Sequence, residues 1–142
     1  MREYVLEDID IGMKESFSQQ ITDKMEDAFR NVTGDENPLH FDDQYAVEIG
    51  KGKYRKHIVF GMLTASFLST MAGMYLPGKY SLIHSIENIS FIRPVYMGDM
   101  LTIEGEVIEK NQELRLIRIR VTIKNQDNNV VSKAKMKILV LR

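Results

Sequence analysis

The chain contains no cysteine, which excludes a disulfide framework, thiol catalysis and cysteine-based zinc sites. This absence fits a reducing compartment, and we expect the cytoplasm. An excess of either charge is also missing, because 19 Lys and Arg stand against 20 Asp and Glu. Without an overall positive field to attract the chain to phosphate backbones, we expect no nucleic-acid partner.

Long apolar runs are missing as well. The longest apolar-rich segment, Val59 to Leu76, is interrupted by Ser and Thr residues and by two glycines, so it falls short of a membrane span. We therefore expect a buried helix there and no membrane partner. The first residues contain no apolar stretch of signal-peptide type.

Repeats, low-complexity tracts and Pro- or Ser-rich linkers are absent from the 142 residues. With 44% apolar and 27% charged residues, the composition is typical of a globular protein with one hydrophobic core. We predict that residues 1–142 form a single domain.

The first half of the chain has a helical period. Apolar positions spaced i, i+3, i+4, i+7 predict the inward face of a first helix: Met25, Ala28, Phe29 and Val32. Thr22 or Asp23 is the expected N-cap, Glu26 is placed for a capping box, and the helix should end near Gly34. A second helix should start at Asp42 or Asp43 and end at Gly50, burying Tyr45, Ala46 and Ile49.

A third helix is predicted from Met62 to Tyr75, with apolar residues on nearly all sides, as expected for a helix wrapped by other structure. After Gly78 the period becomes two. Strands are predicted over residues 82–93, 100–109, 117–124 and 133–140, with a turn at 127–129, and Tyr4 to Leu6 could add an edge strand. The simplest packing is an α+β fold, a curved antiparallel sheet around that helix, whose open edges favour a homodimer.

The densest run of unusual residues lies between Thr33 and Asp42. Gly34, Asn37 and Pro38 favour a turn, so Asp35 and His40 can aim at one point and act as an acid–base pair. The alternative is a simple Asx-turn at Asp35, with His40 leading into the next helix. The residue types alone leave both interpretations open.

Several segments in order resemble the MaoC-like (R)-specific enoyl-CoA hydratases. They are Gly34-Asp35-x-Asn37-Pro38-Leu39-His40, Ala46, Ile58-Val59-x-Gly61-Met62, Leu76-Pro77-Gly78-Lys79, Ser90-Phe91-x-x-Pro94-Val95 and Gly98-Asp99. The resemblance spans most of the chain from the first helix onward. It implies a hot-dog fold, usually with two copies paired. It also implies reversible addition of water to a trans-2-enoyl thioester of coenzyme A or acyl carrier protein, giving the (R)-3-hydroxyacyl product.

The resemblance also implies roles for individual residues. Asp35 and His40 would hold the reacting water, Asn37 would orient the site, and the N–H of Gly61 would hold the thioester oxygen. Ser69, on the same helix as Gly61, matches a family serine that hydrogen-bonds near the catalytic carboxylate. Neither a metal nor a cofactor is implied, and the histidines His40, His57 and His84 show no metal-ligand spacing.

The sequence departs from the family pattern at one position that is expected to lie beside the substrate. The family usually has histidine directly before Gly-Met, where this chain has Phe60. We expect that histidine to be supportive rather than reactive, and Phe60 and Met62 to contact substrate. Lys53 and Arg55, in a basic loop, are expected to meet phosphates of coenzyme A or an acidic carrier, although a solvated charge run is an equally good interpretation.

Two other functions compete with hydration. A hot-dog acyl-thioesterase would share the same groove, but the Asn37 to His40 run argues for hydration. A non-catalytic acyl-binding subunit is the third hypothesis, and Phe60 is its only hint.

Overall fold

The computed structural model describes residues 1–142 and contains five strands and three α-helices. In chain order these are β1 Lys14–Gln20, α1 Asp23–Thr33, α2 Asp43–Ile49, α3 Gly61–Thr70, β2 Ser81–Phe91, β3 Met100–Asn111, β4 Leu116–Lys124 and β5 Val130–Val140. A π-helical turn, Met71–Tyr75, continues α3, and short 3-10 turns lie at Leu6–Asp8 and Pro38–His40. The three predicted helices and four predicted strands after Gly78 are confirmed.

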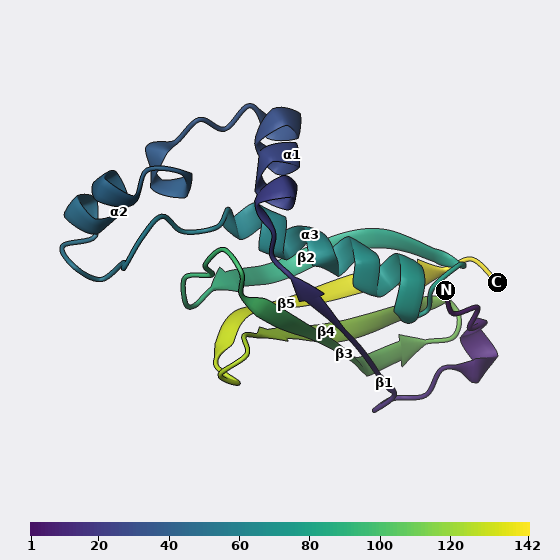
Figure 1. Ribbon diagram of the computed structural model, residues 1–142. Coiled ribbons are helices and arrows are strands. Elements are labelled where there is room, and N and C mark those ends of the chain that lie inside the picture. The colour runs from purple at the N-terminus through teal and green to yellow at the C-terminus, as the bar shows by residue number, and fades with distance from the viewer.

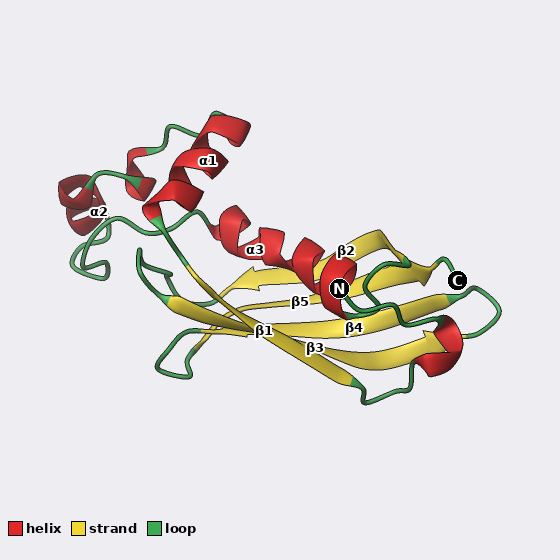
Figure 2. Ribbon diagram, turned by 45° about the vertical axis from the view of Figure 1, so that its right-hand side comes forward, coloured by secondary structure: helices red, strands yellow, loops and turns green.

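The strands form one antiparallel sheet in the order β1-β3-β4-β5-β2. Figures 1 and 2 show the sheet curving around α3, which runs along its concave face. This is the hot-dog arrangement, so the predicted α+β class is confirmed. None of the helices is both long and apolar enough to cross a bilayer.

The core lies between α3 and the sheet, and the period of two in the strands builds it. In β4 the inward residues are completely or almost completely buried: Ile117, Ile119, Val121 and Ile123. Met71, in the π-helical turn, is fully buried against β3. A Cβ at Gly105 would lie 2.8 Å from Met71 Sδ, so glycine permits this close approach of helix and strand.

The edge strand was assigned to the wrong segment. Tyr4 to Leu6 form no strand, and only an isolated bridge joins Glu3 to Gly78. The N-terminal edge strand is β1, whose sequence is polar except for Phe17, and β2 forms the opposite edge of the sheet. Because an edge strand has one free side and little buried surface, its residues show almost no apolar alternation.

The segment from α1 to Ile58 projects beyond one end of the sheet (Figure 1), and we call residues 23–58 the arm. The predicted inward faces of its helices are only partly right. Val32 is 85% exposed and Ile49 58% exposed, and Ala28 and Tyr45 are exposed too, while Ala46 is buried. With no sheet beneath most of the arm, only residues near its base, such as Phe29, pack against the core.

Candidate active site

The turn after α1 is built by side chains that bind their own backbone. Gly34 ends α1 in the left-handed conformation, with φ of 69°. The Asp35 carboxylate then accepts the N–H of Asn37 at 3.0 Å, and the Asn37 side chain accepts the N–H of Leu39 at 3.0 Å. The alternative of an Asx-turn at Asp35 is therefore correct for the local geometry, and it leaves open what else the carboxylate does.

His40 is held on two sides. Its Nδ1 lies 2.8 Å from the carbonyl oxygen of Ile58, and because a carbonyl can only accept, Nδ1 carries the proton and donates it. The other ring nitrogen, Nε2, is then an acceptor in the neutral imidazole. The ring also stacks on the buried Phe60, with centroids 4.2 Å apart. These contacts fix both the orientation and the tautomer of His40.

Asp35 and His40 face one cleft of about 470 Å³. Its lining also includes Phe29, Phe60, Gly61, Met62 and Phe91. The Asp35 side chain is exposed at the rim, and no hydrogen bond joins it directly to His40. A second, mostly apolar cavity of about 240 Å³ shares His40, Gly61 and Phe91 with the cleft, so the two spaces meet at Gly61.

Gly61 begins α3 at this meeting point. The N–H groups of Gly61 and Met62 donate to no acceptor within the chain, as expected for the first turn of a helix without an N-terminal side-chain cap. A Cβ at Gly61 would lie 3.1 Å from the Phe91 ring, so glycine keeps this approach open. Free donors at the positive end of a helix dipole can stabilise a developing negative charge.

The other expected site residues lie farther out. Ser69 is about two turns along α3 from Gly61, on an exposed face, and it lines neither space. Asn37 shapes the turn through its bond to Leu39. Lys53 and Arg55 are exposed in the loop after α2, where the Arg55 guanidinium lies over the Tyr96 ring at 4.3 Å.

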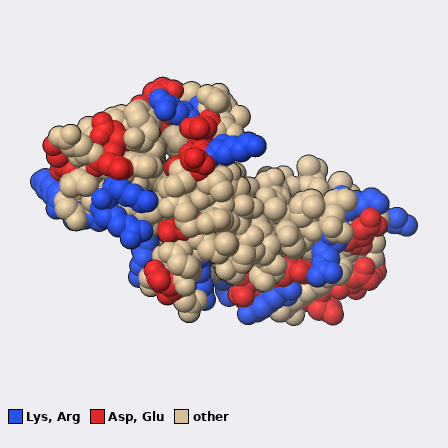
Figure 3. All heavy atoms as spheres, viewed as in Figure 1, with Lys and Arg blue, Asp and Glu red and all other residues tan.

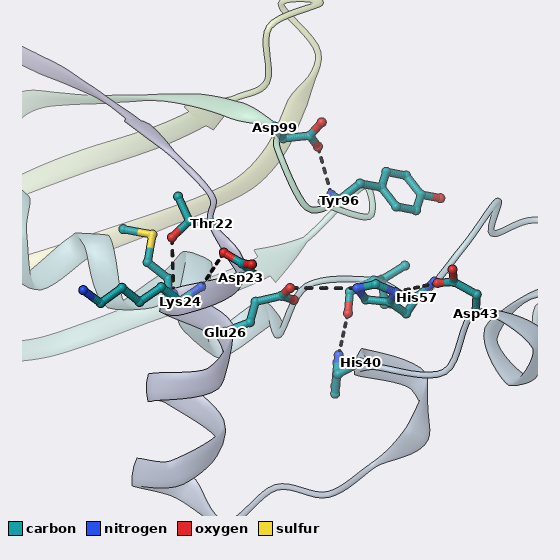
Figure 4. A network of polar contacts seen from close by, with 11 residues as sticks. Thr22, Asp23, Lys24, Glu26, His40, Asp43, His57, Tyr96 and Asp99 are labelled. Carbon is teal, nitrogen blue, oxygen red and sulfur yellow. Dashed lines mark hydrogen bonds and ion pairs between the residues drawn. The ribbon is translucent and has the colours of Figure 1, made fainter.

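The structure places Glu26 beside His57, whereas the sequence analysis predicted a role for Glu26 in a capping box. Glu26 was expected in a capping box, but Thr22 is the N-cap and accepts the N–H of Met25, so Glu26 is one position too late. Its carboxylate is buried and lies 3.9 Å from His57 Nε2, as Figure 4 shows. A signal was present: Glu26 lies three residues before Phe29, on the partly apolar side of α1.

Burial raises the pKa of the Glu26 carboxyl above its ordinary value, and the nearby His57 partly opposes this effect. On the other side of His57, hydrogen bonds from its backbone N–H and its ring lower the pKa of Asp43. No group of three His, Cys, Asp or Glu side chains is arranged to hold a metal ion.

A curved sheet around one helix, with an imidazole and a carboxylate facing a cleft beside free helix N–H groups, defines a protein of the hot-dog class. The family profile described as "MaoC like domain" matches residues 7–130. The chain therefore belongs to the MaoC-like family, as its motifs indicated.

Two curated relatives cover most of the chain. The 3-hydroxybutyryl-CoA dehydratase of Methylorubrum extorquens is 29% identical over 92% of this chain and 81% of its own length. The (R)-specific enoyl-CoA hydratase of Aeromonas caviae is 33% identical over 83% of this chain and 85% of its own length. Both are hydro-lyases, which supports the prediction of a lyase.

A solved structure agrees with the fold. The (R)-hydratase from Aeromonas caviae involved in PHA biosynthesis superposes with a TM-score of 0.85 and 29% identity, covering 93% of this chain and 97% of that one. The same polypeptide architecture therefore extends over nearly the whole of both chains.

Proposed function

We propose that this protein reversibly hydrates trans-2-enoyl thioesters to (R)-3-hydroxyacyl thioesters. The observation that carries the proposal is the single cleft that contains Asp35, His40 and the free N–H of Gly61. These are the groups needed to move protons and to stabilise an oxyanion. The names of the curated relatives support the same reaction.

In the proposed reaction the water oxygen bonds to C3 of the enoyl group, and a proton is added at C2. Asp35 and His40 hold the water between them, remove one of its protons and deliver a proton to C2. Negative charge develops on the thioester oxygen, which the N–H of Gly61 stabilises. Asn37 keeps the turn that places Asp35, and Phe60 keeps the ring of His40 in position.

The substrate-facing roles of Phe60 and Met62 are supported by their place in the cleft. Phe60 presents an apolar ring where the family usually has histidine. Phe60 stacks on the His40 ring. Its proposed effect is therefore to hold the imidazole in place and to exclude water from one face of that ring. The reaction needs no metal or cofactor in this proposal.

An assay with crotonyl-CoA tests the proposal. Loss of the enoyl absorbance without release of free thiol is the result expected for a hydratase. Release of thiol would instead identify a thioesterase. If neither signal changes, the protein is a non-catalytic acyl-binding subunit and the proposal fails. The chiral form of the product is checked with an (R)-specific 3-hydroxyacyl dehydrogenase.

The basic loop is the proposed contact for the phosphates of coenzyme A. In Figure 3 the Lys and Arg side chains gather along the lower side of the arm, below α2, where residues 51–56 lie. We predict that Lys53→Glu and Arg55→Glu each raise KM for crotonyl-CoA several-fold, more at low salt, with kcat little changed. Lys14→Glu, on β1, is the matched control.

Steady-state kinetics at two salt concentrations measure this effect. An unchanged KM in both loop variants would mean that the loop is only a solvated charge run. Comparing kcat/KM for the acyl-carrier-protein thioester with that for the coenzyme A thioester then shows which carrier the loop favours.

A homodimer is proposed from the face beside β2. This edge strand pairs only with β5, and it exposes Leu82 and Ile86. The adjoining face of α3 exposes Met62 and Ser69, and Figure 3 shows no charged side chain over α3. An uncharged helix face beside an unpaired strand is a surface that a second copy can cover.

We predict twice the chain mass by light scattering at micromolar concentration. Ile86→Lys, which places a charge on the β2 surface, should shift the mass towards the monomer, whereas Lys14→Glu should not. A monomeric wild-type protein would contradict the proposed dimer.

The cytoplasmic location also stays a prediction.

A further inference from the structure

A third cavity, of about 150 Å³, adjoins His40. The stacked rings of His40 and Phe60 line both this cavity and the 470 Å³ cleft, so they stand between the two spaces. Asp35 is the only Asp, Glu, Lys or Arg in the lining of the cleft, whereas the small cavity is lined by several charged residues, Glu26 among them, and by His57. It is therefore a polar space on the far side of the proposed catalytic imidazole.

Glu26 is an unusual residue to find in such a place. It is only 7% exposed, and its Oε1 has no hydrogen-bond partner. Its Oε2 lies 3.9 Å from His57 Nε2, the contact that defines what we call the Glu26–His57 pair. A buried carboxylate without full hydrogen bonding destabilises a fold, so its presence needs a reason other than stability.

His57 is anchored from the opposite side by Asp43. The Asp43 carboxylate accepts both the backbone N–H of His57, at 2.9 Å, and its ring Nδ1–H, at 2.5 Å. With Nδ1 donating to Asp43, Nε2 has no proton in the neutral ring and would face a second acceptor, Glu26. His57 therefore lies between two carboxylates, with Asp43 on its Nδ1 side and Glu26 on its Nε2 side.

The next residue links this pair to the cleft. Ile58 follows His57 directly, and its carbonyl oxygen accepts the Nδ1–H of His40. Asp43 and Glu26 therefore hold the start of the backbone segment that orients His40, as Figure 4 shows. Ile58 and Val59 are fixed further by hydrogen bonds from their N–H groups to the carbonyls of Leu39 and Val95.

We propose that Glu26 and His57 are positioning residues for His40: they hold the segment that orients its ring and place a buried negative charge on its far side. A negative charge there favours the protonated ring that forms when His40 takes a proton from water. This inference rests on the proposed function, because it assigns His40 a proton-transfer role.

Other charged groups also face the small cavity, and any pH effect includes them. Those that line it are Asp23, Asp27 and Arg30 on α1. Asp43 and Lys56 lie outside its lining but close to His57. Asp27 and Asp23 are exposed and Glu26 is buried, so Glu26 is the least screened of the carboxylates on α1.

Glu26→Gln is the principal test. The variant keeps the shape of the side chain but removes its charge. We expect kcat to fall roughly ten-fold, with KM within about two-fold of wild type, because the substrate cleft is untouched. The acidic limb of the pH–rate profile should also move to lower pH, since the titration of a carboxyl with a raised pKa is gone.

Thermal stability separates this role from a structural one. Because burial raises the pKa of Glu26, the folded state loses stability as pH rises from the ordinary carboxyl pKa through the raised value. Removing the carboxyl should therefore leave Tm unchanged or higher at pH 8, with less gain at pH 5. Lower kcat together with an undiminished Tm supports a positioning role, whereas a fall in kcat that follows a fall in Tm overturns it.

Two further variants complete the design. Asp27→Asn removes an exposed carboxylate from the same helix and should leave kcat and the pH–rate profile unchanged. His57→Gln should lower kcat as Glu26→Gln does, and the double variant should be no worse than the poorer single one, because the two residues act as a unit. Additive losses of kcat in the double variant, or an unchanged kcat in Glu26→Gln, would contradict the proposal that Glu26 and His57 act as a unit to position His40.

A readout that needs no activity keeps this inference distinct from the proposed function. The His40 ring signals in NMR, assigned by their loss in His40→Ala, should move in Glu26→Gln relative to wild type at the same pH, whereas Asp27→Asn should leave them in place. If wild type lacks hydratase activity but the signals move, the proposed function fails and the pair stands. If activity is present but the signals do not move, the positioning role of the Glu26–His57 pair is wrong and the proposed function stands.

Discussion

Asp35→Asn is expected to lower kcat for crotonyl-CoA hydration by about 10²–10⁴-fold, the range typical of a positioned acid–base group. The amide oxygen of Asn can still accept the N–H of Asn37, so the turn after α1 should persist. Since the residue is also exposed, Tm should stay within about 2 °C of wild type. The change therefore removes a proton-transfer group and little else.

Steady-state kinetics and thermal unfolding of the same preparation measure both quantities. The matched control is Asp42→Asn, since Asp42 accepts the N–H of Tyr45 at the start of α2 and lies outside the cleft. This control makes the same carboxylate-to-amide exchange in a neighbouring turn and should keep normal kcat. Near-normal turnover in Asp35→Asn would remove Asp35 from the proposed mechanism.

His40→Ala is expected to lower kcat by a similar factor, about 10²–10⁴-fold, because the Nε2 acceptor is lost. This variant differs from the first in its stability. It also loses the hydrogen bond to Ile58 and the stacking on Phe60, so a cost of about 1–2 kcal/mol in unfolding free energy is expected.

Because this variant is less stable, its folded fraction must be measured by circular dichroism at the assay temperature. Added imidazole provides a sharper check, since it can enter the space left by the ring and restore part of the activity. Asp35→Asn should gain nothing from imidazole and serves as the control. Normal turnover of His40→Ala would contradict its proposed role, and so would a loss fully explained by unfolded protein.

The central part of the fold could be predicted from residue patterns alone. β4 and β5 alternate apolar and polar residues because each has one face on the core and one in solvent. The helix that became α3 contains no charged residue, and such a helix is stable only when other structure surrounds it. These two patterns together predicted a sheet around a helix.

Sequence patterns gave wrong predictions for segments that bury little apolar surface in the core. β1 is an edge strand with mostly polar residues, and its pairing with β3 depends on backbone hydrogen bonds, which any sequence can make. On the arm, Val32 and Ile49 have the spacing of inward residues but no sheet beneath them. Periodicity shows which side of a helix is apolar and does not show what covers that side.

The amino-acid sequence by itself determined the turn that presents Asp35 and His40, because Gly34, Asn37 and Pro38 impose it through local geometry. Only the tertiary structure decided that Glu26 faces His57. These two residues meet through the return path of the loop after α2, which is fixed by long-range hydrogen bonds and packing. Local bonds act between neighbours in the chain and can be inferred from their order, whereas a contact between distant segments depends on the packing of the whole fold.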